Sequence, residues 1–122
     1  MLIGNGTFEG RGGHVLRGTF RFDRSDGGVV RLTTSDDFFF DGSPAPGFAL
    51  SASGDPSAAE AAATDFLRLP GSGSLSGAQI EVRGAQGGIV PDSIDIRAQK
   101  VLFLWCYITP FLLGVGVIEH SG

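Results

Sequence analysis

One thiol is the most reactive side chain in this sequence. Cys106 is the only cysteine among 122 residues, so the chain can form neither an internal disulfide nor a zinc site with several thiolates. A single thiolate can still coordinate haem iron, form a mixed disulfide or oxidise reversibly. In the alternative role, a free cysteine in a strand is a small buried apolar residue with an inert thiol. The residues alone leave both roles open.

The other candidate groups are two histidines and a group of aspartates. A metal site would have to use His14 with carboxylates, because His120 lies close to the last residue and is expected to be solvated. Asp36, Asp37 and Asp41 surround three phenylalanines, but their spacing matches no calcium loop. Aspartates at turns usually bond their own backbone or face water, so we predict no metal site.

Motifs of conventional catalysis are scarce. The sequence has no Gly-x-Ser-x-Gly elbow, no phosphate-binding loop with a lysine and no His-Glu-x-x-His pattern. A hydrolase is therefore unsupported, and we expect a protein that is not an enzyme.

Composition limits both the fold and the partners. Twenty glycines and six prolines disfavour regular helix, whereas a hydrophobic content of 42% with ten phenylalanines suffices for one core. We therefore expect a single all-β domain over residues 1–122. Nine basic residues against thirteen acidic ones give a net charge of −4, which argues against nucleic-acid binding.

Alternating apolar and polar residues indicate short antiparallel strands. The clearest pattern covers residues 15–22, and the turn sequence DRSDGG at 23–28 connects it to a second strand. Further patterns lie at residues 30–33, 48–52, 66–69, 80–83 and 94–97. About eight or nine strands predict an antiparallel β-sandwich or a partly closed barrel.

One short helix is expected near residues 56–65. Asp55 can cap its first turn, Pro56 suits the first helical position, and residues 58–63 have the highest helix propensity of the chain.

The uncharged run at residues 101–118 has two alternative structures. Its 18 residues lie at the lower limit for a membrane-spanning helix, but Pro110, two glycines and many β-branched and aromatic residues favour two buried strands joined by a turn near Thr109. We therefore expect no membrane span. Because residues 101–107 are apolar on both faces, the first strand should be central, with Trp105 and Cys106 pointing to opposite sides of the sheet.

The same region carries a family resemblance. Residues 101–106 read VLFLWC, and Phe111, Gly114 and the pair Val117-Ile118 follow them. This order resembles the C-terminal signature of the electron-transfer DM-thirteen domain, in which a hydrophobic strand closes on Trp-Cys and a Phe-Gly-like turn and a last strand come next.

Earlier segments resemble that family in the same order, so the similarity covers roughly residues 7–119. They are His14-x-x-x-Gly18, Val30-x-Leu32, Asp37-Phe38, Pro46-Gly47-Phe48 with Leu50, and Leu75-x-Gly77-x-Gln79. Two features depart from the pattern. Ile80 and Val82 stand where the family usually has an aromatic residue, and residues 58–63 lengthen a connection.

The resemblance implies an all-β domain that is exported, periplasmic or extracellular, and that works beside another redox protein or domain. Cys106 would be its redox residue, Trp105 the neighbour in the motif and His14 the nearest candidate partner. Such a module would act with or without a bound haem or metal. The first residues show no signal peptide, so a cytoplasmic location is also open. The alternative function is a noncatalytic ligand- or protein-binding β-sandwich with Cys106 in its core and recognition in loops 41–47 and 70–77. The oligomeric state is not predicted.

Overall fold

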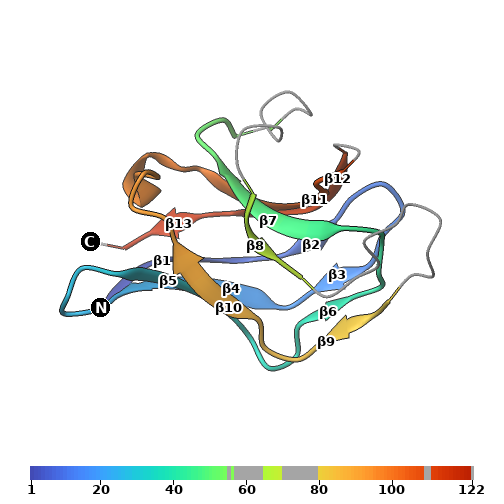
Figure 1. Ribbon diagram of the computed structural model, residues 1–122, viewed down its shortest axis with the longest axis horizontal. Coiled ribbons are helices and arrows are strands. Elements are labelled where there is room, and N and C mark those ends of the chain that lie inside the picture. Colours follow the sequence, from blue (N-terminus) through green and yellow to red (C-terminus); the bar gives the residue numbers. More distant parts are fainter. Residues whose placement is uncertain (55, 57–64, 70–79, 109–110, 122) are drawn as a thin grey trace.

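The computed structural model describes residues 1–54, 56, 65–69, 80–108 and 111–121, and these residues fold into three antiparallel sheets (Figure 1). The described part contains thirteen strand segments, eight of which have four or more residues. The chain is all-β, as the sequence predicts, and its sheets form a sandwich and not a closed barrel.

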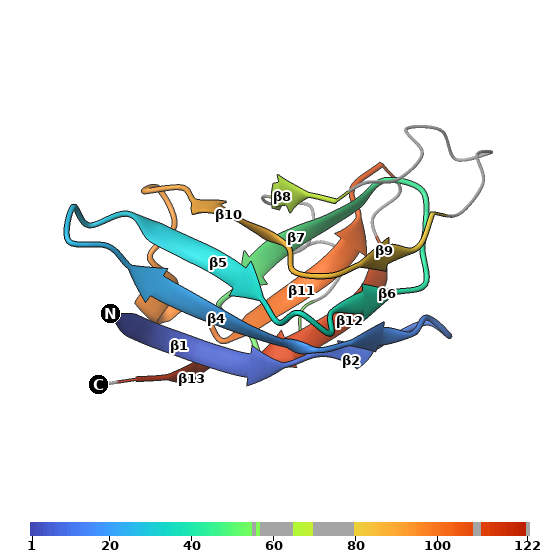
Figure 2. The ribbon, with the colours of Figure 1, turned by 90° about the horizontal axis from the view of Figure 1, so that it is seen from below.

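Two five-stranded sheets form the layers of the sandwich. The first sheet has the order β10 (Gly87–Val90), β5 (Val30–Thr34), β4 (Thr19–Arg24), β1 (Leu2–Thr7) and β13 (Glu119–His120). The second has the order β2 (Glu9–Gly10), β12 (Leu112–Val117), β11 (Val101–Cys106), β7 (Pro46–Ser51) and β8 (Asp65–Arg68). A small third sheet, β3 (Leu16–Arg17), β6 (Phe39–Phe40) and β9 (Val82–Arg83), lies at one end of the sandwich (Figure 2).

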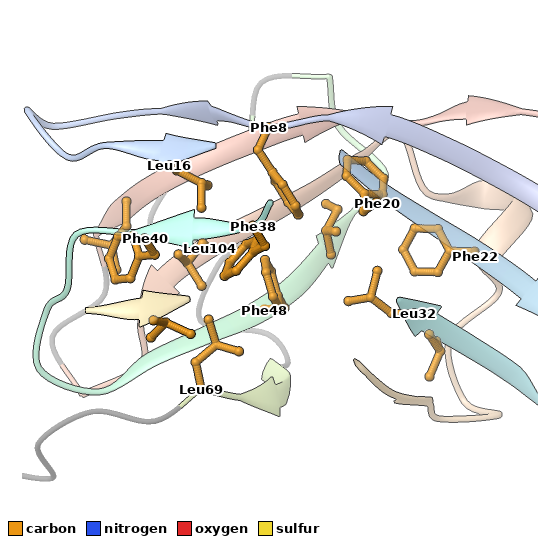
Figure 3. Close-up of a cluster of buried hydrophobic side chains, with 14 of the residues drawn as sticks. Phe8, Leu16, Phe20, Phe22, Leu32, Phe38, Phe40, Phe48, Leu69 and Leu104 are labelled. Carbon is orange, nitrogen blue, oxygen red and sulfur yellow. The ribbon is translucent and has the colours of Figure 1, made fainter. Parts of the chain in front are cut away.

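The core between the layers is rich in phenylalanine (Figure 3). Phe8 contacts three other rings of this core, with ring centroids 4.9 Å from Phe20, 5.5 Å from Phe38 and 5.6 Å from Phe48. These rings come from the first sheet, the second sheet and the connections between strands. These tilted, edge-to-face and stacked ring contacts add to the stabilisation from burial alone.

Alternation correctly predicts the first hairpin. Phe20 and Phe22 of β4 and Leu32 of β5 are buried, and β4 pairs antiparallel with β5 with Phe22 opposite Leu32. The predicted strand at residues 15–22 is nevertheless divided into β3 and β4. Gly18 separates them with φ of +114°, a conformation that side-chain-bearing residues rarely adopt.

The predicted strand at residues 94–97 is wrong. Residues Ile96–Ala98 form one turn of 3₁₀ helix, and the Asp95 carboxylate accepts a hydrogen bond of 3.2 Å from the Arg97 backbone N–H. This local bond offers the backbone an alternative to strand pairing. Ile96 is still buried. The alternation of apolar and polar residues at 94–97 therefore indicates a buried side chain correctly, but it does not indicate a strand.

One further expectation lies largely outside the described residues, and another is confirmed only in part. The helix predicted near residues 56–65 falls mainly on 57–64, which lie outside them, while Asp65 begins β8. At residues 80–83 only Val82–Arg83 form a strand.

The apolar run at residues 101–118 forms two strands. β11 and β12 pair antiparallel, with Val101 opposite Val117 and Leu104 opposite Gly114. Thr109 and Pro110, where the sequence predicts the turn, lie outside the described residues. Within the described part of the chain, no helix has the length and apolar character needed to cross a membrane.

Glycine lets the two sheets approach each other closely at Phe20. This ring lies against Gly6 of β1 and Gly116 of β12, and a Cβ added at either glycine would overlap it. At Gly27, by contrast, an added Cβ would meet only the Ser25 hydroxyl, at 3.9 Å.

Gly116→Ala is therefore expected to lower the free energy of unfolding by about 1–3 kcal/mol, because the packed core must shift to admit the methyl group. Gly27→Ala, the matched control, should change it by no more than about 0.5 kcal/mol. Urea unfolding of both variants measures the difference. Equal stability of the two variants would contradict the close approach at Phe20.

Candidate functional site

Cys106 lies inside the sandwich core. It is the last residue of β11, has no exposed surface and belongs to the large apolar cluster together with Leu102 and Leu104 of the same strand. Its backbone N–H donates to the Phe111 carbonyl, at 3.2 Å, and its register partner on β7 is Pro46. The thiol is thus surrounded by apolar packing.

Trp105 lies on the opposite face of β11, as alternation predicts. It belongs to a second, smaller cluster with Val101 and Phe103, and its ring centroid is 6.2 Å from that of Phe103. Only 3% of Trp105 is exposed, and its indole N–H has no hydrogen-bond partner among the described residues. Trp105 and Cys106 therefore do not share one site.

His14 is bound to a different residue. Its Nδ1 lies 2.9 Å from the Asp41 carboxylate, and its ring packs on Phe40 with a centroid distance of 5.6 Å. The second carboxylate oxygen of Asp41 accepts the backbone N–H of Val15 at 3.0 Å. Asp41 thereby fixes the half-buried His14 against the end of the third sheet, and no contact with Cys106 is involved.

Two of the remaining polar candidates, Asp37 and His120, also have structural partners. Asp37 accepts a hydrogen bond from the Ser35 hydroxyl, and Nε2 of His120 lies 2.6 Å from the Gln99 carbonyl oxygen, so His120 is anchored although it is exposed. Across the described residues, no group of three or more His, Cys, Asp and Glu side chains is placed to hold a metal ion.

Haem does not fit these residues. A thiolate ligand requires room for the porphyrin next to its sulfur. Cys106 has no exposed surface and is enclosed by core side chains, so the structure leaves no room for a porphyrin beside its sulfur. Cys106, the redox residue that the family resemblance implies, is therefore not placed to ligate haem in this structure.

A hollow of about 590 Å³ lies on the outer face of the first sheet. Its volume falls within the range of ordinary ligand sites, roughly 300–1,000 Å³. Sequence reasoning missed it, because short polar residues on a strand indicate only a solvent-facing side. We call it the polar hollow, and its polar side chains are Asn5, Thr7, Thr19, Arg21, Thr33 and Glu119, together with Thr34 and Ser35, whose hydroxyls already bond Gln86 and Asp37.

An ion pair fixes Arg21, the only cation among the described residues that line the polar hollow. Nε and Nη2 of Arg21 each donate to a different oxygen of Asp23, at 2.7 Å in both cases. These hydrogen bonds, more than the Coulomb attraction, hold the pKa of Asp23 below its usual value of 3.8 and raise that of Arg21. The guanidinium plane is therefore oriented before any ligand arrives.

Comparison of the chain with protein-family models, with curated proteins and with solved structures gives no match.

The packing of Cys106 predicts an order of stabilities. Cys106→Ser buries a hydroxyl in apolar surroundings, which should lower the free energy of unfolding by about 1–3 kcal/mol. Cys106→Ala removes one heavy atom without adding a polar group, so it should be the more stable of the two variants. Urea unfolding compares them. A serine variant as stable as the unmodified chain would mean that the sulfur is solvated.

The Arg21–Asp23 pair predicts a difference in acid. Because the folded state lowers the pKa of Asp23, its stabilising effect is present above the ordinary carboxyl pKa and is lost as pH falls through the lower, folded-state value. Asp23→Asn should therefore lose less stability than the unmodified chain between about pH 5 and pH 2. The difference should be small and should shrink in high salt, since the pair is partly exposed. Parallel acid curves at low salt would contradict the ion pair.

Proposed function

We propose that this chain is a DM-thirteen-type β-sandwich that acts as a noncatalytic binding module, with Cys106 as a structural residue of its core. The absence of exposed surface at Cys106 carries the proposal. A thiol that reacts with partners or metals needs access and groups that favour its thiolate. The immediate surroundings of Cys106 are the apolar side chains of the large cluster.

The binding surface of such a module must lie elsewhere. Loop 41–47 offers little of it, because Gly42, Ser43, Ala45 and Pro46 are all buried. Loop 70–77 lies outside the described residues. The polar hollow combines ligand-sized volume with exposed polar side chains, so it is the surface that best supports a binding function.

Electron transfer through Cys106 is the second proposal, and one contact favours it. Tyr107, which follows Cys106, is half-buried, and the Arg68 guanidinium carbon lies 4.1 Å from its ring centroid. Tyr107 is thus a partly exposed residue directly next to the buried Cys106. Under this proposal, a partner redox protein or domain docks near Tyr107, and the domain is exported, periplasmic or extracellular, as the family resemblance implies.

Thiol labelling distinguishes the two proposals. The native protein is mixed with a small maleimide, with and without denaturant, and its visible spectrum is recorded after addition of haem. If Cys106 is structural, the maleimide should label it at least about a hundredfold faster in denaturant than in the native state. The visible spectrum should then show no haem bound to the native protein.

Rapid labelling of native Cys106, or a haem spectrum that disappears in Cys106→Ala, would overturn the structural role and favour the redox proposal. Ser93→Ala, at an exposed position away from β11, is the control for nonspecific effects of substitution.

A further inference from the structure

We propose that the polar hollow binds a neutral, polyhydroxylated ligand, a carbohydrate chain. The inference rests on the proposed binding function and names its ligand class. It follows from the strand register, the uncommitted side chains and the charge of the hollow.

The strand register places the polar side chains in two rows on one face. Asn5 of β1 pairs with both Glu119 of β13 and Arg21 of β4, and Arg21 pairs with Thr33 of β5. A second row, two residues along the strands, begins with Thr7 opposite Thr19. Polar groups therefore repeat about every 5 Å across the strands and about every 7 Å along them. A chain of hydroxyl-bearing rings can contact several of these groups at once.

Most of these side chains have hydrogen-bonding capacity to spare. Within the described residues, the side chains of Asn5, Thr7, Thr19 and Thr33 make no hydrogen bond. Each threonine offers one donor and two acceptor positions, and the asparagine amide offers both kinds. The Arg21 guanidinium uses two of its N–H groups on Asp23, which leaves three free. Each hydroxyl group of a ligand both donates and accepts hydrogen bonds, so it suits a surface that offers donors and acceptors together.

The charge of the polar hollow disfavours an anionic ligand. Asp23 neutralises Arg21, and Glu119 adds an exposed carboxylate at the edge. An anion would meet this carboxylate without a free positive charge to compensate for it. A neutral ligand gains the hydrogen bonds without that repulsion.

One wall of the polar hollow is apolar. The chain passes from the second sheet to the first between β12 and β13, and Val117, which is 65% exposed, stands at this crossing beside Glu119. An exposed valine beside polar rows suits a sugar ring, which has both C–H and hydroxyl surfaces. The outer face of an antiparallel sheet is ordinarily polar, but here short uncharged side chains leave a volume that long charged ones would fill.

The test is a titration of the full chain followed by the NMR signals of its backbone amides. The probes are the neutral pentasaccharides of glucose, N-acetylglucosamine, mannose and galactose, with pentagalacturonic acid as the anionic comparison. The double variant Thr19→Val, Thr33→Val removes two hydroxyls from the hollow and keeps strand-forming side chains of the same shape. Ser93→Ala removes an exposed hydroxyl outside it.

We expect at least one neutral pentasaccharide to shift the amide signals of Asn5, Thr19 and Thr33. The double variant should weaken its binding by about tenfold, as expected for two lost hydrogen bonds of ordinary net strength, and Ser93→Ala should leave it unchanged.

The inference would be overturned by the absence of any shift with a neutral probe at millimolar concentration, by binding of the acidic probe alone, or by equal binding of the double variant. Shifts confined to another surface would also overturn it while leaving the proposed binding function standing. Conversely, saccharide binding together with rapid labelling of native Cys106 would support the inference and overturn the structural role of the cysteine.

Discussion

Burial of β11 on both faces is the constraint on which the sandwich depends. Leu102, Leu104 and Cys106 face the large cluster, whereas Val101, Phe103 and Trp105 face the small one, and all six are buried. Burial of one side chain of this size contributes about 1.5–3 kcal/mol to the free energy of unfolding. Its neighbours β7 and β12 pair along nearly its whole length, so this strand connects the two halves of the second sheet. The orientation of Cys106 follows from that arrangement, because a change of one residue in register would turn every side chain of the strand to the other cluster.

The functional assignment follows from the same burial. The motif that suggests redox chemistry places Trp105 and Cys106 next to each other in sequence, yet strand geometry separates them by the thickness of the sheet. His14 is bound to Asp41 at the third sheet. The residues linked by the family resemblance therefore serve three separate parts of the structure, and the surface with uncommitted polar groups is the polar hollow on the other sheet.

Local sequence pattern predicts those features that depend on one strand and its neighbour. Alternation correctly indicates β4, β5 and the opposite orientations of Trp105 and Cys106, since each follows from a period of two residues. It fails at residues 94–97, where the Asp95 carboxylate stabilises a tight turn around a buried Ile96. The His14–Asp41 pair and the polar hollow could not be predicted, because they join residues far apart in the chain and depend on the order and register of strands.

Native-state hydrogen exchange at the backbone amides of Trp105 and Cys106 tests the central claim most directly. If β11 is the sealed centre of the sandwich, these two amides should exchange only through global unfolding, so their opening free energy should equal the free energy of unfolding measured with urea. The amides of the exposed β13 should exchange through openings of much lower free energy. Exchange of the Trp105 and Cys106 amides through a local opening well below the global value would contradict the account.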